Sequence, residues 1–412
     1  MLDQVFHRTA VRERLVDNPI GVVLQQYVGY LVVRGHRTGT VHQYVFVIEH
    51  FGRWLGRRPI NHASVERFVR SRQPQRRGNA RAGNIKTVRA ALNRLLDMLA
   101  PTQPAPACRT FAERLLKNYA SHLDGVCGLS AATIQYRLRY ARALLQRRRI
   151  RRRGQLRAWS PVQIAQSIAA VGRRCKPSSG QVLAGSIRSF LRFLLAQRLI
   201  ARDLAAAVPS FANWRLASLP AVVDYGELER MAAAVDVSTP IGMRDRAILL
   251  CLTQLGLRAC DVAGLRIEDV DFDAQVLRLH RPKQRDCVAV PISNAVAQAI
   301  RLYVRRGRPA CANSSLFVVH RAPVGQRLAS IGVRGIVVRR AAEAGLAKQV
   351  RGTHVIRHSV ATALINRGAS IKLIADFLGH RSIDTTSIYA KVDLRSLSRV
   401  ALPWPTAWEV TP

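Results

Sequence analysis

Cysteine is scarce in this sequence and forms no metal-binding pattern. Seven cysteines are spread over 412 residues, and no two of them stand as a Cys-x-x-Cys pair. Structural zinc sites and disulfide frameworks usually show paired or evenly numbered cysteines at close spacing. We therefore expect neither a structural zinc site nor a disulfide framework.

Long apolar runs are also missing. The amino terminus reads MLDQVFHRTAVRERL, which lacks the apolar core of a secretory signal peptide. No segment reaches the roughly 20 apolar residues that a membrane-spanning helix needs. We expect a protein of the reducing cytoplasm without a membrane partner.

Acidic residues are few. The sequence has 25 Asp and Glu against 65 Lys and Arg, which gives a formal net charge of +40. Such an excess is typical of proteins that bind a polyanion, although the densest run, RRRIRRR at Arg147–Arg153, can also be a solvated loop. Charge alone would also suit an RNA-binding or ribosomal protein, but 48% apolar residues indicate that the chain folds around hydrophobic cores.

The last third of the sequence carries side chains that can cleave a phosphodiester without a metal ion. Arg258 and Arg357 can each bind a phosphate through parallel hydrogen bonds, which suits the negative charge of a five-coordinate transition state. The phenol of Tyr389 has an ordinary pKa of about 10, and we expect neighbouring cations and a histidine base to depress it. Candidates for proton transfer and phosphate contact are Lys283, His354 and His380.

This chemistry would conserve the energy of the cleaved bond. Attack by a tyrosine leaves a reactive aryl phosphate, so a second DNA end can reverse the attack without ATP. In a dry, cationic site the pKa of Lys283 can fall far enough for this residue to protonate the departing 5′ oxygen. We therefore expect cutting and rejoining to need no metal ion and no other cofactor.

Three stretches around these residues carry a family resemblance. They read TQLGLRACDVAGLRIEDVDF at Thr253–Phe272, THVIRHSVATA at Thr353–Ala363 and LGHRSIDTTSIY at Leu378–Tyr389. Together they resemble the three signature boxes of the tyrosine recombinases, or phage integrase family. The similarity to the family's GLR motif implies that Arg258 is the first catalytic arginine and that Asp261 supports it.

The resemblance also implies the remaining roles. The HxxR and LGH…Y motifs correspond to His354, Arg357, His380 and the nucleophile Tyr389, which would carry the 3′-phosphate of the DNA. Lys283 corresponds to the family's hairpin lysine, counted back from the strand end at Val290–Ile292. Family members usually have glycine beside that lysine, whereas this turn reads RPKQRD. The neighbouring His358 is expected to be structural.

Two proline-containing linkers, Ala100–Ala107 and Pro209–Pro220, divide the chain. They predict an N-terminal helical domain at 1–100, a core-binding helical domain at 108–208 and a catalytic domain at 219–412 with a C-terminal tail. In the family, a core-binding domain clamps DNA opposite the catalytic domain. Between the two linkers, amphipathic helices are predicted at Phe111–Leu123, Ala131–Gln146, Ser160–Val171 and Val182–Gln197.

Residues 20–100 look like a second, core-binding-like (SAM-like) copy. The same spacing separates Tyr27, Leu31 and Tyr44 in residues 20–100 and Tyr119, Leu123 and Tyr136 in the core-binding domain. A tandem duplication is one reading, and chance similarity between amphipathic helices is the other. A second copy could bind DNA beyond the core site or contact another protomer.

The catalytic part predicts helices and one hairpin. Helices are expected at 226–235, 243–255, 259–265 and 293–303, and strands at 269–272, 275–280 and 287–291. The alternation in VLRLHRP and CVAVPI is typical of an antiparallel pair. The expected fold class is mainly α with a small antiparallel β-sheet (α+β), whose hairpin tip carries Lys283.

These observations predict a site-specific tyrosine recombinase or integrase that cleaves and rejoins double-stranded DNA through a 3′-phosphotyrosyl intermediate, as in integration, excision or transposition of a mobile element. The resemblance implies a tetramer on paired recombination sites, with accessory recombinases as further partners and a place on the nucleoid. A type IB-like topoisomerase shares this chemistry and stays an alternative. A non-catalytic DNA-binding relative is the other alternative.

Overall fold

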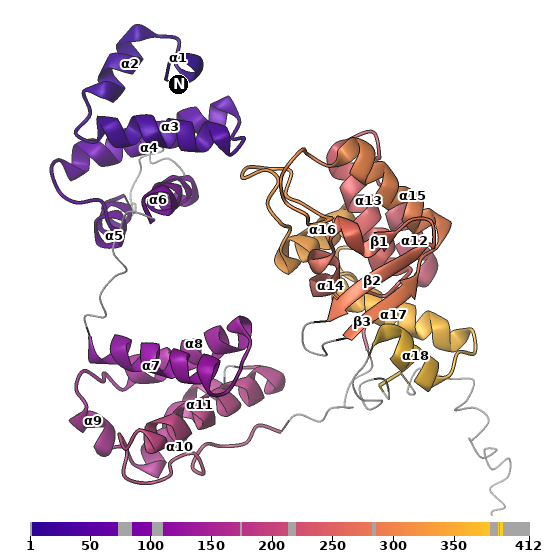
Figure 1. Cartoon of the computed structure of the whole chain (residues 1–412). Coiled ribbons are helices and arrows are strands. Elements are labelled where there is room, and N and C mark those ends of the chain that lie inside the picture. The colour runs from indigo at the N-terminus through magenta and orange to yellow at the C-terminus, as the bar shows by residue number, and fades with distance from the viewer. Residues whose placement is uncertain are drawn as a thin grey trace, which may run out of the picture. The chain divides into compact units, whose positions relative to one another are not determined.

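The computed structural model describes residues 2–72, 85–100, 110–173, 175–212, 220–281 and 286–379, together with 386, 388 and 389. These residues form helices and one small antiparallel sheet (Figure 1), which confirms the predicted fold class. The chain divides into two compact units, one of Met1–Thr102 with Leu219–Pro412 and one of Gln103–Ser218. The division into three domains stays a prediction.

The amino-terminal stretch is a set of helices around its own hydrophobic core. Tyr27 is fully buried and donates a hydrogen bond to the carbonyl oxygen of Ala91 at 2.8 Å, which ties α3 to α6. The Asn61 side chain accepts a hydrogen bond from the backbone N–H of Ser64 and so caps α5. The helices are α1 (Leu2–Val5), α2 (Thr9–Val16), α3 (Gly21–Val33), α4 (Thr38–Leu55), α5 (His62–Ser71) and α6 (Ile85–Leu99).

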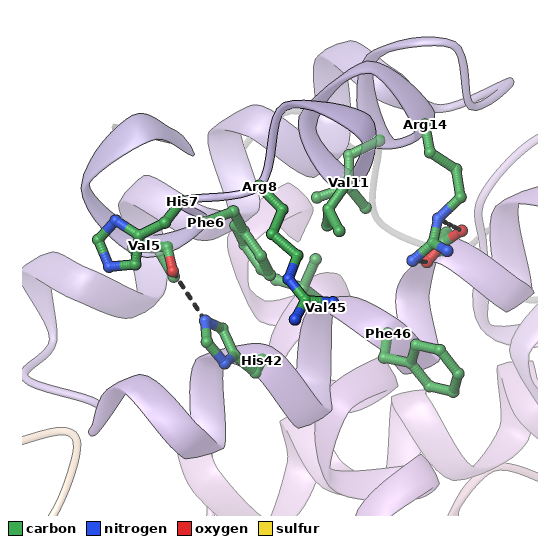
Figure 2. Close-up of a pocket in the computed structure, with 11 residues that line it drawn as sticks. Val5, Phe6, His7, Arg8, Val11, Arg14, His42, Val45 and Phe46 are labelled. Atoms are coloured by element: carbon green, nitrogen blue, oxygen red, sulfur yellow. Dashed lines mark hydrogen bonds and ion pairs between the residues drawn. The ribbon is translucent and has the colours of Figure 1, made fainter.

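A pocket of about 390 Å³ lies between the first two helices and α4 (Figure 2). Its wall is largely apolar, with Phe6 and Phe46 among its lining residues. His42 Nε2 lies 2.8 Å from the carbonyl oxygen of Val5 at its edge, and Arg14 pairs with the buried carboxylate of Glu49 at 2.9 Å. None of the predicted catalytic residues lines this pocket.

The second unit is also helical. Tyr119 is fully buried, and its hydroxyl lies 2.9 Å from the Ser189 hydroxyl oxygen, which joins α7 to α11. Ser160 caps α10, which begins at Pro161, one residue after the predicted start at Ser160. α11 begins earlier than the predicted start at Val182. The helices are α7 (Phe111–Gly125), α8 (Ala131–Arg147), α9 (Gly154–Arg157), α10 (Pro161–Gly172) and α11 (Pro177–Ala196).

The two helical stretches pair their helices in the same order. α3 contacts α4, α4 contacts α6, and α5 contacts α6; correspondingly, α7 contacts α8, α8 contacts α11, and α10 contacts α11. In both stretches a buried tyrosine, Tyr27 on α3 and Tyr119 on α7, hydrogen-bonds to the last helix. The second tyrosine differs, because Tyr44 is half-buried and Tyr136 is exposed. This order favours the tandem duplication, which stays a prediction.

The stretch from residue 220 onward has its own core of aliphatic side chains, including Ile248, Leu252 and Ile356. Side chains of Asp224 and Thr239 cap its first two helices. No helix within the described ranges has both the length and the apolar character needed to cross a membrane. The helical elements are α12 (Tyr225–Ala233), α13 (Pro240–Thr253), α14 (Ala259–Gly264), η2 (Ile267–Asp269), α15 (Asn294–Leu302), η3 (Tyr303–Gly307), α16 (Ser330–Glu343), α17 (Thr353–Asn366) and α18 (Ile371–Leu378).

A buried carboxylate joins α13 to α16. Asp245 is fully buried, and its Oδ1 accepts a hydrogen bond from Arg244 Nη2 at 2.8 Å. Its Oδ2 accepts from Arg339 Nη2 at 2.7 Å and from Arg340 Nη2 at 2.6 Å. A carboxylate that is buried away from water is tolerated only when cations and hydrogen bonds replace its lost hydration. The cluster fixes α13, whose C-terminal end leads into the turn before Arg258.

The sheet is an antiparallel meander of β1 (Val270–Asp271), β2 (Val276–Arg281) and β3 (Asp286–Pro291). Leu277 pairs with Val290, and both are buried, so alternate side chains of the hairpin face the core. β1 is shorter than predicted because Asp269 belongs to η2. The predicted position of Lys283, at the hairpin tip, lies outside the described residues.

Candidate active site

The described residues include most of the predicted site. Lys283 and His380 lie outside them, so their predicted roles are not tested. The predicted site residues within the described part are Arg258, Asp261, His354, Arg357 and Tyr389.

Arg258 is the residue before α14, and two contacts orient it. Its Nη2 donates a hydrogen bond to the Gly379 carbonyl oxygen at 3.3 Å. Its Nη1 lies 4.0 Å from Asp261 Oδ2, which also accepts from the Arg258 backbone N–H at 3.3 Å. Asp261 therefore holds both the main chain and the guanidinium of Arg258. The Arg258 side chain is 33% exposed, so a ligand can reach it.

Gly256 allows the turn that precedes Arg258. Its φ of +58° lies in the left-handed region, and a Cβ there would stand 2.7 Å from Leu378 Cδ2 and 3.4 Å from Val360 Cγ1. A side chain at this position would therefore be both strained and obstructed. The close approach brings the Thr253–Phe272 stretch against Val360 in the middle of α17 and Leu378 at the end of α18.

Arg357 joins the three signature stretches. The residue lies on α17, is 6% exposed, and donates hydrogen bonds of 2.6 Å from Nη1 to the Gly256 oxygen and from Nη2 to the Leu378 oxygen. His354 lies three residues earlier in the first turn of α17 and is exposed. At this spacing the two side chains share one face of the helix.

Tyr389 is 1% exposed and packs against Ala361, Ile365, Ile374 and Leu378. Burial raises the pKa of its phenol above the ordinary value, although the charges of Arg357 and Arg258 act to lower it. The expectation that neighbouring cations depress this pKa is therefore wrong for the protein without DNA, because desolvation outweighs the two arginines. The opposing effects show that both guanidinium groups act on the phenol.

Among the described residues, His358 lies within hydrogen-bonding distance of the phenol oxygen of Tyr389. Its Nδ1 lies 2.8 Å from the Tyr389 hydroxyl, and the two rings stand edge to face with centroids 5.6 Å apart. Burial, with His354 and Arg357, lowers the pKa of His358. The sequence placed this histidine beside Arg357 but gave no sign of a partner, since the two residues are 31 positions apart.

Across the ranges that the structure describes, no group of three or more His, Cys, Asp or Glu side chains is arranged to hold a metal ion. Cys251 is fully buried, and this burial raises the pKa of its thiol to about 12.

Comparisons with known proteins define the family. Residues 222–395 match the model of the phage integrase family. The protein y4rF of Sinorhizobium fredii (strain NBRC 101917 / NGR234), named as an integrase/recombinase, is 30% identical over 419 residues, covering 98% of this chain and 96% of the relative. Tyrosine recombinase XerD of Bifidobacterium longum (strain NCC 2705) is 34% identical over 226 residues, covering 52% and 70%.

Solved structures show the same fold. XerH bound to a palindromic difH substrate in a post-cleavage complex superposes with a TM-score of 0.54 at 17% identity, covering 82% of this chain and 93% of XerH. A lambda integrase fragment, crystallised as a dimer on a COC′ core site, gives a TM-score of 0.52 at 17% identity, covering 67% and 94%. These two likenesses concern the fold. This chain belongs to the phage integrase family of tyrosine recombinases, whose members cleave and rejoin DNA.

Proposed function

We propose that this chain is a site-specific recombinase that cleaves and rejoins double-stranded DNA through a 3′-phosphotyrosyl intermediate. The observation that supports this most is the convergence of Arg258, Arg357 and Tyr389 from three separate parts of the sequence. Both arginines act on the phenol, and both hydrogen-bond to the Leu378–Gly379 end of α18. A phosphate beside these groups would meet two guanidinium donors and one nucleophile.

The reaction follows from this arrangement. The Tyr389 oxygen forms a bond to phosphorus while the bond from phosphorus to the 5′ oxygen breaks, and the charge that develops on the non-bridging oxygens is stabilised by Arg258 and Arg357. Lys283 donates the proton that the 5′ oxygen needs in order to leave. His354 and His380 contact the same phosphate, and Asp261 holds Arg258. No metal ion and no nucleotide cofactor enters these steps.

The proposed partner is DNA at specific recombination sites. The net charge of +40 suits a polyanion, and the XerH and lambda integrase structures that resemble this chain are complexes with a difH substrate and a core site. We infer a tetramer acting on paired sites in the cytoplasm, on the nucleoid, with accessory recombinases as further partners. Relatives named as integrases or as XerD favour recombination over a type IB-like topoisomerase.

A covalent-capture assay tests the proposal. Nicked duplexes made from the DNA that flanks the encoding gene should give a detergent-resistant complex with the parent chain and none with Tyr389→Phe, which should still bind the DNA. A parent chain that binds but forms no covalent complex would make the non-catalytic relative the better description. A chain that relaxes supercoils with one site and never joins two sites would be a topoisomerase.

A further inference from the structure

Within the part of the chain that the structure describes, the histidine directly beside the Tyr389 hydroxyl is His358, which is not in the predicted catalytic set. His358 Nδ1 lies 2.8 Å from the hydroxyl oxygen, within the 2.6–3.2 Å range that a general base requires. His354, by contrast, is exposed on the first turn of α17. Consecutive helical positions place Arg357 and His358 on different sides of α17, so one residue can face the phosphate clamp while the next faces the phenol.

On the basis of the proposed function, we propose that His358 is the general base of strand cleavage: its Nδ1 receives the proton of the Tyr389 hydroxyl as the phenol oxygen attacks phosphorus. The assignment rests on the contact between these two side chains and on the burial of Tyr389, which leaves 1% of the residue exposed to solvent. Bulk water therefore has little access to this proton in the described arrangement. A base inside the protein must therefore take the proton, and His358 is in contact with the hydroxyl that loses it.

The protonation state of His358 suits this role. The groups that act on its charge are His354 and Arg357 of its own helix, and the phenol of Tyr389 faces it from the chain beyond α18. Burial, followed by the effects of His354 and Arg357, keeps the pKa of His358 below the ordinary histidine value of about 6.5, so the imidazole is neutral at pH 7. A neutral imidazole carries one nitrogen that accepts a proton.

The step balances in protons and electrons. The phenol oxygen supplies the electron pair of the new bond to phosphorus, and the electron pair of the breaking bond goes to the 5′ oxygen. His358 gains the proton that the phenol loses, and the 5′ oxygen gains one from Lys283. When a 5′ hydroxyl attacks the phosphotyrosine in the rejoining step, both transfers run backwards, so the site returns to its starting state.

The test compares His358→Asn with the parent chain. An asparagine amide can keep a hydrogen bond to the hydroxyl, in place of Nδ1, but it cannot hold the transferred proton. The rate of covalent-complex formation on the nicked duplexes, measured from pH 5 to 9 with DNA limiting, should fall by about 10²-fold or more in His358→Asn. The parent rate should decline on the acid side, at a pH below the ordinary histidine pKa of about 6.5, because protonated His358 cannot accept a proton. The variant should lack this decline.

A matched control is available in the same stretch. His320 Nε2 lies 3.1 Å from the Tyr303 hydroxyl in another partly buried histidine–tyrosine pair. His320→Asn disturbs that pair and should leave the cleavage rate within a few-fold of the parent and the acid decline unchanged. If His320→Asn loses as much activity as His358→Asn, the loss is a general effect of disturbing this stretch, and the assignment fails.

Two further outcomes would overturn the assignment of His358 as the general base. Cleavage by His358→Asn within a few-fold of the parent, or with the parent's acid decline, would mean that His358 only holds the phenol. A direct NMR titration of the histidines in the folded parent chain must also give His358 the pKa at which cleavage declines, a requirement that does not depend on how the variant folds. A parent chain that forms no covalent complex would instead refute the proposed function.

Discussion

Replacing Arg357 by lysine should damage both the fold and the chemistry, and the two effects can be separated. The guanidinium spans from the Gly256 oxygen to the Leu378 oxygen with two hydrogen bonds of 2.6 Å. A lysine ammonium keeps the positive charge but is a point donor on a flexible stem, so it cannot reproduce this planar fork. At least one of the two carbonyl oxygens would lose its charged partner.

The structure gives a magnitude for each effect. Hydrogen bonds to charged groups contribute about 1.5–3 kcal/mol each, so Arg357→Lys should lower the free energy of unfolding by about that amount in urea denaturation. Loss of one bidentate transition-state donor should slow covalent-complex formation by about 10²-fold or more. The assay is capture on the nicked duplexes under conditions where the variant is folded.

Arg340→Lys is the matched control. Arg340 donates from Nε at 2.9 Å and from Nη2 at 2.6 Å to the buried carboxylate of Asp245, well outside the proposed phosphate site. This variant should lose a similar amount of stability while the folded protein cleaves within a few-fold of the parent. If Arg357→Lys cleaves no more slowly than Arg340→Lys, Arg357 is not a phosphate clamp.

Three other outcomes are expected. Gly256→Ala should lower the free energy of unfolding by about 1–3 kcal/mol, because φ is +58° and the new Cβ would meet Leu378. The control Gly335→Ala, on the exposed face of α16, should raise the free energy of unfolding by about 0.5–1 kcal/mol. Equal effects of the two variants in urea denaturation would contradict the role given to Gly256 in this turn. Cleavage should proceed in excess chelator, and a strict divalent-metal requirement for the chemical step would exclude the tyrosine mechanism. Lys283→Ala should recover most of its lost cleavage rate on a substrate with a bridging 5′ sulfur, and Arg258→Ala far less; no rescue of Lys283→Ala would place the acid elsewhere.

Local pattern was enough to predict most helices and the hairpin, because their apolar spacing agrees with their final burial. The start of α11 shows where pattern fails. The helix is predicted to begin at Val182, yet the segment from Pro177 to Gly180 is already helical, with Pro177 in the first turn. Gly180 packs on Phe211, whose ring a Cβ would approach to 2.7 Å. This contact comes from 31 residues further along the chain and cannot be seen in a local window.

The candidate site, like the fold, could be predicted from the sequence only in part. The motifs around Arg258, Arg357 and Tyr389 could be found in the sequence because each is a short, fixed pattern. The neighbour of the phenol could not, since His358 and Tyr389 meet only when the chain beyond α18 packs on α17. The direction of the pKa shift of Tyr389 could not be predicted either, because the sequence shows the cations near a motif but not the desolvation that opposes them.

The most direct test of this account is the identity of the residue that carries the DNA. The covalent complex trapped on a nicked duplex can be digested, and the peptide that bears the nucleotide can be sequenced by mass spectrometry. We expect one modified residue, Tyr389, joined through a 3′-phosphate, and no such peptide from Tyr389→Phe. A nucleotide attached to any other side chain, or joined through a 5′-phosphate, would contradict the proposed mechanism.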